Sequence, residues 1–176
     1  MGEAILPESF LDDRSTTIAR DLKLNLRRLL EEGALSPLEA TTALLALATA
    51  VSHSPLAKVA REKLSALGLA PEAIQESAES AAIMGMLNIY YRFRHLVDNE
   101  HDYVTAGLRM TSLARPALGK TQFEMLAFAV SVLNGCPSCV KSHEKALRDA
   151  SVGVDKIHDL ARLASVVYGL KALESS

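Results

Sequence analysis

Residues 121–150 read TQFEMLAFAVSVLNGCPSCVKSHEKALRDA, and this stretch decides the fold. Its apolar residues recur every three or four positions, which is the spacing of an α-helix. Gly135 interrupts the pattern, so we predict one helix over about 121–134 and another over about 136–150. If the two helices fold back on each other around Gly135, the segment forms a helical hairpin.

The same periodicity extends outward from this hairpin over most of the chain, and no segment alternates convincingly as a strand would. Ser36 is a good N-cap and Pro37 suits a first helical position, so they open one of the helices. Residues 98–120 contain two glycines and a proline and lack a clean period, which predicts a long connection with a short helical turn. We predict an all-α fold whose other helices span about 17–32, 37–51, 55–67, 71–94 and 155–173.

The hairpin has a faint echo earlier in the chain. Residues 45–64, LALATAVSHSPLAKVAREKL, resemble residues 126–147. We interpret the chain as a single domain, residues 1–176, with a weak internal duplication of about 36–97 and 119–174 and the active site in the C-terminal half. The alternative is that two helical hairpins rich in Ala and Leu resemble each other by composition alone.

Charge and hydropathy argue against several kinds of partner. The chain has 19 basic and 21 acidic residues, a formal net charge of −2 and no run of five like charges. We therefore expect no nucleic acid and no acidic membrane surface as partner. No uninterrupted apolar run reaches the roughly 18 to 20 residues that span a bilayer. The N-terminus lacks the basic start and apolar centre of a signal peptide, so we predict a cytoplasmic protein whose thiols are kept reduced.

The two cysteines of the chain, Cys136 and Cys139, form one Cys-x-x-Cys motif. In a reducing compartment this spacing indicates a redox-active pair or a metal site. Pro137 favours the first helical position, which places Cys136 at or beside the N-cap, where unpaired N–H groups and the helix dipole favour an anion. Across the first turn of a helix, two such sulfurs can bond with little backbone movement. The sequence therefore predicts an activated thiol pair at a helix start.

Two further side chains could move protons at this pair. His143 lies four residues after Cys139 and shares its helix face, so the imidazole could take or return a proton directly or through one water. Glu124 lies on the preceding helix and would face His143 if the hairpin closes. Two alternatives stay open: His143 could be a surface histidine, and Glu124 could form a capping box with Thr121.

The two thiols, with His143 and Glu124, could instead hold zinc. A structural zinc site usually draws a second paired motif from elsewhere, and this sequence has none, so we predict no bound metal. Arg92 and Arg94 are interpreted as part of a solvated helix end, the alternative being that they face a partner together with Tyr90 and Tyr91. The remaining histidines have no cysteine neighbours and are interpreted as structural: His53, His95, His101 and His158.

Glu124, followed by Asn134-Gly135-Cys136-x-x-Cys139-x-x-x-His143-Glu144, resembles the active-site signature of the alkyl hydroperoxide reductase D (AhpD) family, which belongs to the carboxymuconolactone decarboxylase-like group. Residues 21–26, 81–88 and 107–110 also resemble stretches of that family, so the likeness covers nearly the whole chain. The resemblance implies an AhpD-like all-α fold with two similar helical halves, and assembly into homotrimers.

The resemblance also implies an enzyme, an antioxidant lipoyl-dependent peroxidase with no bound cofactor. Family members reduce alkyl hydroperoxides and re-reduce an AhpC-type peroxiredoxin. Their electrons come from dihydrolipoamide on the acyltransferase of a 2-oxoacid dehydrogenase complex. Carried over, Cys139 is the peroxidatic thiol that becomes a sulfenic acid, and Cys136 is the proton donor and the resolving thiol that closes a disulfide with Cys139. His143 and Glu124 form the proton relay, in which Glu124 orients His143.

One position departs from the family pattern. Where the family has His just before the second cysteine, this chain has Ser138, which cannot titrate near neutral pH. Either thiol could be the nucleophile. Thioredoxin-like helix starts use the N-terminal thiol, which is Cys136 here. The base beside Cys139, His143, favours Cys139 instead, and we follow that assignment. Two other functions remain as alternatives: a decarboxylase or lactone-processing enzyme on the same fold, and a non-catalytic zinc-holding interaction module.

Overall fold

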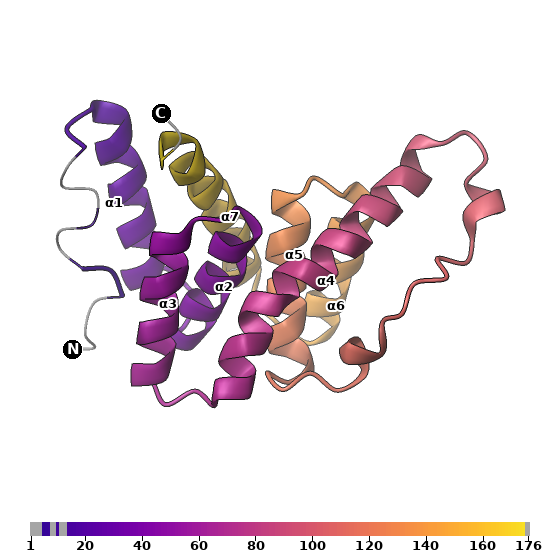
Figure 1. Ribbon diagram of the computed structural model, residues 1–176, viewed down its shortest axis with the longest axis horizontal. Helices are drawn as coiled ribbons and strands as arrows, with labels where there is room; N and C mark the ends of the chain where they lie inside the picture. The colour runs from indigo at the N-terminus through magenta and orange to yellow at the C-terminus, as the bar shows by residue number, and fades with distance from the viewer. Residues whose placement is uncertain (1–4, 8–9, 11–13, 175–176) are drawn as a thin grey trace.

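The computed structural model describes residues 5–7, 10 and 14–174. Within these residues every regular element is a helix, and there are no strands (Figure 1). The predicted all-α fold class is confirmed. The elements in chain order are α1 (Thr17–Glu31), α2 (Pro37–Ala50), α3 (Ser54–Ala66), α4 (Pro71–Leu96), the 3-10 helices η1 (Glu100–Tyr103) and η2 (Thr111–Ala114), α5 (Lys120–Leu133), α6 (Pro137–Asp149) and α7 (Val154–Glu174).

The helix bounds agree with the sequence pattern because caps and breakers lie where the pattern changes. Ser36 accepts a hydrogen bond from the Glu39 amide, and the Glu39 carboxylate accepts one from the Ser36 amide, so α2 opens with a capping box. The predicted connection after α4 contains two short 3-10 helices rather than one turn. His53, interpreted as structural, caps α3 by accepting from the Leu56 amide.

The core is built around α2 and α5, which pack against each other and against α4 and α7. Both helices are apolar around most of their circumference, and every residue of 40–48 and of 125–131 is buried. A helix that is hydrophobic all round belongs in the interior. Each fully buried leucine there contributes about 1.5–3 kcal/mol of transfer free energy. The sequence thus places the hairpin helix α5 at the centre of the molecule.

The three helices α2–α4 and the three helices α5–α7 begin at positions separated by the same number of residues. Lys120, Pro137 and Val154, which begin α5, α6 and α7, each lie 83 residues after Pro37, Ser54 and Pro71, which begin α2, α3 and α4. The ends of α2 and α3 lie the same 83 residues before the ends of α5 and α6. The duplication stays a proposal, and these repeated bounds are the structural observation behind it.

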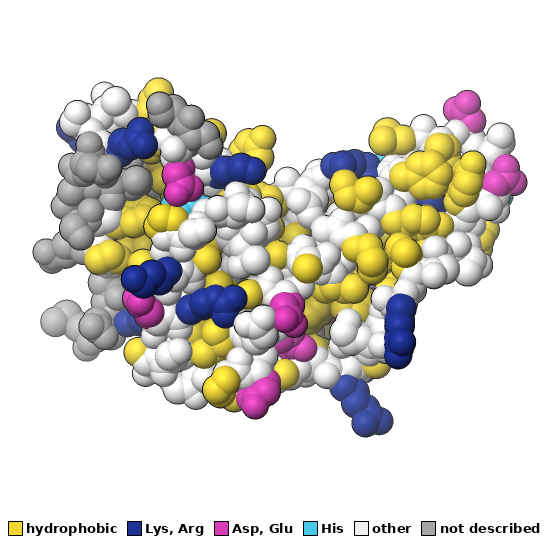
Figure 2. All heavy atoms as spheres, viewed as in Figure 1, with side chains coloured by type: hydrophobic (Ala, Val, Ile, Leu, Met, Phe, Trp, Pro, Cys, Tyr) yellow, Lys and Arg dark blue, Asp and Glu magenta, His cyan; other side chains and the backbone are white. Residues whose placement is uncertain are grey.

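The long helix α4 shapes the outline of the molecule. It crosses α5 and α6, and its C-terminal end protrudes with η1 as an arm on the right of Figure 1. Hydrophobic side chains gather on this arm in Figure 2. The large exposed apolar residues of α4 and η1, with the residue after η1, are Met86, Ile89, Phe93, Leu96, Tyr103 and Val104.

Across the residues that the structure describes, every helix is too short or too polar to cross a bilayer.

Candidate active site

The α5–α6 turn forms as the sequence predicts. Gly135 follows the last residues of α5 with φ = 63°, a left-handed conformation that glycine adopts without Cβ strain. The Cys136 amide bonds to the Ser131 carbonyl at 3.2 Å, which satisfies one of the free carbonyls at the end of α5. Cys136 is then the N-cap of α6, and Pro137 is its first residue. The predicted N-cap position of Cys136 is confirmed.

The two cysteines are joined by a disulfide, which is the bond that the family resemblance implies. Their Cα atoms lie 5.3 Å apart across the first turn of α6. The Cys136 side chain is fully buried, and Cys139 is 6% exposed. The pair is therefore shielded from bulk water, and an attacking group must reach it through a defined opening.

Glu124 and His143 meet across the hairpin. The Glu124 Oε2 atom lies 2.6 Å from His143 Nδ1. This contact contradicts the capping-box interpretation of Glu124, because α5 begins at Lys120, Gly119 is the N-cap, and Thr121 lies inside the first turn. A carboxylate that accepts from Nδ1–H fixes the proton on that nitrogen, so Nε2 carries the lone pair. His143 is thus oriented as a base by Glu124.

A cavity of about 430 Å³ opens onto one of the two sulfurs. Cys139 and His143 line it together with Ser138 and Ser142 of the same helix, and Cys136 does not line it. The opposite wall is formed by apolar and aromatic side chains, Met84, Leu87 and Tyr91 of α4 and Met110 and Leu113 of the following connection. Cys139 is therefore the sulfur that a ligand in this cavity reaches, next to the oriented histidine.

The described residues contain no group of three or more His, Cys, Asp and Glu side chains placed to hold a metal ion. In the disulfide form neither cysteine offers a thiolate to zinc.

Sequence reasoning missed a polar network that α4 extends to the α5–α6 turn. Asn88 donates to the Ser131 hydroxyl at 2.9 Å and accepts from the Asn134 amide group at 3.0 Å. Arg92, interpreted from sequence as part of a solvated helix end, donates to the Asn134 carbonyl at 2.5 Å. Asn88 and Arg92 are four residues apart, so they share a helix face, and this spacing is the signal that could have found them.

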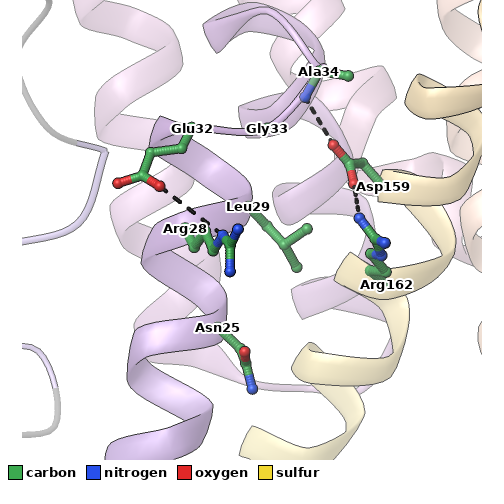
Figure 3. A pocket seen from close by; sticks show the side chains of 8 residues that line it. All are labelled: Asn25, Arg28, Leu29, Glu32, Gly33, Ala34, Asp159 and Arg162. Carbon is green, nitrogen blue, oxygen red and sulfur yellow. Dashed lines mark hydrogen bonds and ion pairs between the residues drawn. The ribbon is translucent and has the colours of Figure 1, made fainter.

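A second cavity, of about 460 Å³, lies between the end of α1 and α7, away from the cysteines (Figure 3). Its buried carboxylate, Asp159, accepts from the Ala34 amide at 2.8 Å and from Arg162 at 3.0 Å. Figure 3 shows Asp159 pointing at Ala34, with Arg162 on its other side. The carboxylate is thus satisfied within the fold, and it fastens the α1–α2 loop to α7.

Comparison with known proteins gives the family of this chain. Residues 100–176 match the model of the carboxymuconolactone decarboxylase family. The chain is 36% identical over 162 residues to alkyl hydroperoxide reductase AhpD of Gluconacetobacter diazotrophicus, covering 92% of this chain and 89% of that protein. It is 40% identical over 152 residues to alkyl hydroperoxide reductase AhpD of Mycolicibacterium smegmatis, covering 86% and 85%. The protein of the same name from Streptomyces coelicolor is 40% identical over 150 residues, covering 85% and 84%.

The match to the first of these relatives covers 92% of this chain at 36% identity, so it extends over most of the fold. The chain therefore belongs to the AhpD family of alkyl hydroperoxide reductases.

Proposed function

We propose that this protein is an AhpD-type alkyl hydroperoxide reductase, a thiol peroxidase that also re-reduces an AhpC-type peroxiredoxin. The observation that carries the proposal is the cavity that exposes Cys139 beside a histidine oriented by Glu124. The relatives that share its sequence over most of its length bear the name of this activity.

The oxidative half of the cycle begins with the dithiol. His143, held by Glu124, removes the Cys139 proton, and the thiolate attacks the terminal peroxide oxygen. The O–O bond breaks, Cys139 becomes a sulfenic acid, and the leaving alkoxide takes a proton from Cys136 and departs as an alcohol. The Cys136 thiolate then attacks the Cys139 sulfur. Its S–S bond replaces the S–O bond, and the hydroxide leaves as water with a proton returned from His143.

The reductive half would use dihydrolipoamide as donor. One of its thiolates attacks the Cys139 sulfur, which lines the cavity, and Cys136 leaves as the thiolate. The second lipoyl thiol then attacks the mixed disulfide, releasing oxidised lipoamide and the Cys139 thiol. The apolar wall of Met84, Leu87 and Met110 supports this choice, because it suits an uncharged alkyl or lipoyl chain better than a charged thiol.

The proposal extends to the partners. A lipoyl-bearing acyltransferase of a 2-oxoacid dehydrogenase complex would deliver the electrons, and the oxidised peroxiredoxin would receive them. The chain would act as a homotrimer, as its family resemblance implies. The exposed apolar residues on the α4 arm support assembly, since such surface is normally covered in soluble proteins.

The test is hydroperoxide consumption by the purified protein with dihydrolipoamide as sole reductant. Wild type should turn over, and Cys139→Ser should be inactive because it lacks the attacking thiol. Ser142→Ala is the matched control, since Ser142 lines the same cavity and is expected to leave turnover within a factor of about two.

The outcomes separate the possible functions. Turnover in wild type that survives a Cys136→Ala, Cys139→Ala double change would refute the thiol mechanism and favour other chemistry of the superfamily. A disulfide that dihydrolipoamide reduces in a protein without peroxidase activity would leave only the peroxiredoxin-reductase half of the proposal.

A further inference from the structure

The turn that carries Cys136 is held from outside the hairpin. Within the hairpin, three backbone amides of the turn bond back to α5: Asn134 to Val130, Gly135 to Val132 and Cys136 to Ser131. The Cys136 carbonyl accepts from the Val140 amide of α6. The side chains that reach the turn from another element are Asn88 and Arg92 of α4. Both side chains form hydrogen bonds with Asn134, which lies two residues before Cys136.

Burial makes these contacts specific. Asn88 and Ser131 are both fully buried, and the Asn88 amide group pairs on both sides, with Ser131 and with Asn134. A buried amide without partners loses its hydration with no compensation, so this arrangement admits one position of the turn relative to α4. Arg92 adds a charge-assisted hydrogen bond to the Asn134 carbonyl, at the C-terminal end of α5, where a cation is favoured.

The same helix also forms the wall of the cavity. Met84, Leu87 and Tyr91 face Cys139 from α4, and Asn88 and Arg92 hold the turn before Cys136. One rigid element thus sets both the space in which the Cys139 sulfur reacts and the place of its partner sulfur. The Cys136 side chain is fully buried, so it cannot move to reach Cys139 if the turn is displaced.

We propose that Asn88 and Arg92 are positioning residues that hold the Cys136 sulfur ready to close the disulfide with Cys139. The inference rests on the proposed function, because closure is its resolving step. In that step the Cys136 thiolate forms the S–S bond, the S–O bond of the sulfenic acid breaks, and the hydroxide leaves as water after protonation. Correct placement of two reacting atoms accounts for large effective concentrations, so a displaced turn slows closure and weakens the disulfide.

The first experiment measures the dithiol–disulfide equilibrium in dithiothreitol redox buffers, which needs no peroxide. Arg92→Met and Asn88→Ala should each lower the equilibrium constant for disulfide formation by about tenfold, as expected when one reacting group is misplaced. Arg92→Lys keeps a cationic donor for the Asn134 carbonyl and should recover part of the loss. Gln122→Ala is the control, because Gln122 makes a comparable contact between helices, to Thr42, away from the turn.

The second experiment gives one equivalent of an alkyl hydroperoxide to the reduced protein in the presence of dimedone, which traps sulfenic acids. Wild type and Gln122→Ala should close the disulfide before trapping, and the two α4 variants should accumulate the trapped Cys139 adduct. A merely structural role would lower thermal stability in all variants and change neither the equilibrium nor the trapped fraction.

An unchanged equilibrium in folded Arg92→Met would overturn the inference, and this partly exposed position decides the matter if Asn88→Ala does not fold. A wild type that forms the disulfide normally but makes no sulfenic acid with peroxide would contradict the peroxidase proposal alone, since the buffer equilibrium still tests the positioning role.

Discussion

At the scale of single residues, Ser138 lies between the two cysteines in the first turn of α6. Its hydroxyl lies 3.6 Å from Cys136 Sγ, and the residue lines the cavity beside Cys139. During reduction Cys136 leaves as a thiolate inside the protein, where a hydrogen-bond donor stabilises the charge. Ser138 can supply that donor, although it cannot exchange protons near neutral pH as a histidine does.

Ser138→Ala should therefore slow reduction of the disulfide by dihydrolipoamide by about tenfold, equivalent to one hydrogen bond to a charged group. Ser138→His should restore the rate and make it vary with pH between about 5 and 8, where imidazole titrates. Stopped-flow reduction over this pH range measures both effects, with Ser142→Ala as control. Equal rates for serine and alanine at position 138 would show that the hydroxyl does not assist the leaving sulfur.

At the scale of helices, caps and turns decide where each element ends. Burial raises the pKa of Glu39, but hydrogen bonds with Lys156 and Ser36 outweigh it and hold the pKa below its ordinary value of 4.5. Both Glu39 oxygens lie 2.7 Å from Lys156 Nζ, so the same carboxylate caps α2 and ties it to α7. A carboxylate with a lowered folded-state pKa stabilises the fold above its unfolded value and loses that contribution as the pH falls through the folded value.

Glu39→Gln should thus lower the free energy of unfolding by about 1–2 kcal/mol at pH 7, and the difference from wild type should shrink below about pH 4.5. Urea unfolding at pH 7 and at lower pH measures it. Glu72→Gln, at an exposed acid in the first turn of α4, is the control. A deficit that stays constant down to pH 3 would mean that the carboxylate charge is not what stabilises α2.

The turn after α2 repeats the turn after α5, but without a glycine. Ser52 has φ = 60°, and Gly135, 83 residues later, has φ = 63°. A left-handed conformation costs a residue with a Cβ about 1–2 kcal/mol, which exceeds the extra chain entropy that glycine loses on folding.

Ser52→Gly should therefore raise the free energy of unfolding by about 0.5–1 kcal/mol, and Gly135→Ser should lower it. Thermal unfolding of both variants tests this. Destabilisation by Ser52→Gly would show that the serine side chain offsets the backbone strain.

At the scale of the whole molecule, the α4 arm leaves the body with its apolar side chains uncovered (Figure 2). Leu96, at the end of α4, is 74% exposed, so most of this apolar side chain is not buried within one chain. If the homotrimer forms through this arm, a charge there should weaken assembly without changing the stability of the subunit.

Wild type should sediment as a trimer, and Leu96→Glu should shift it toward smaller species at micromolar concentration. Ile18→Glu on α1, where the side chain is 69% exposed, is the matched control and should remain trimeric. A wild type that sediments as a monomer would contradict the proposed assembly, and a trimeric Leu96→Glu protein would place its interface elsewhere.

The sequence by itself determined the helices, their hairpin and the thiol pair, because these depend on neighbours in the chain. Apolar residues at helical spacing, Ser36 before Pro37, and Gly135 before Cys136 and Pro137 define element ends through local hydrogen bonds and backbone geometry. The role of Glu124 was one of two alternatives, because Thr121 and Glu124 also have the spacing of a capping box.

Only the tertiary structure decided what surrounds the thiols. Packing of α4 across the α5–α6 hairpin brings Asn88 to within hydrogen-bonding distance of Ser131 and Asn134, more than forty residues away, and closes an apolar cavity over Cys139. Such contacts depend on how the buried faces of several helices fit together. Helical periodicity fixes which residues share a face, and the fit of the packed core fixes which of those faces meet.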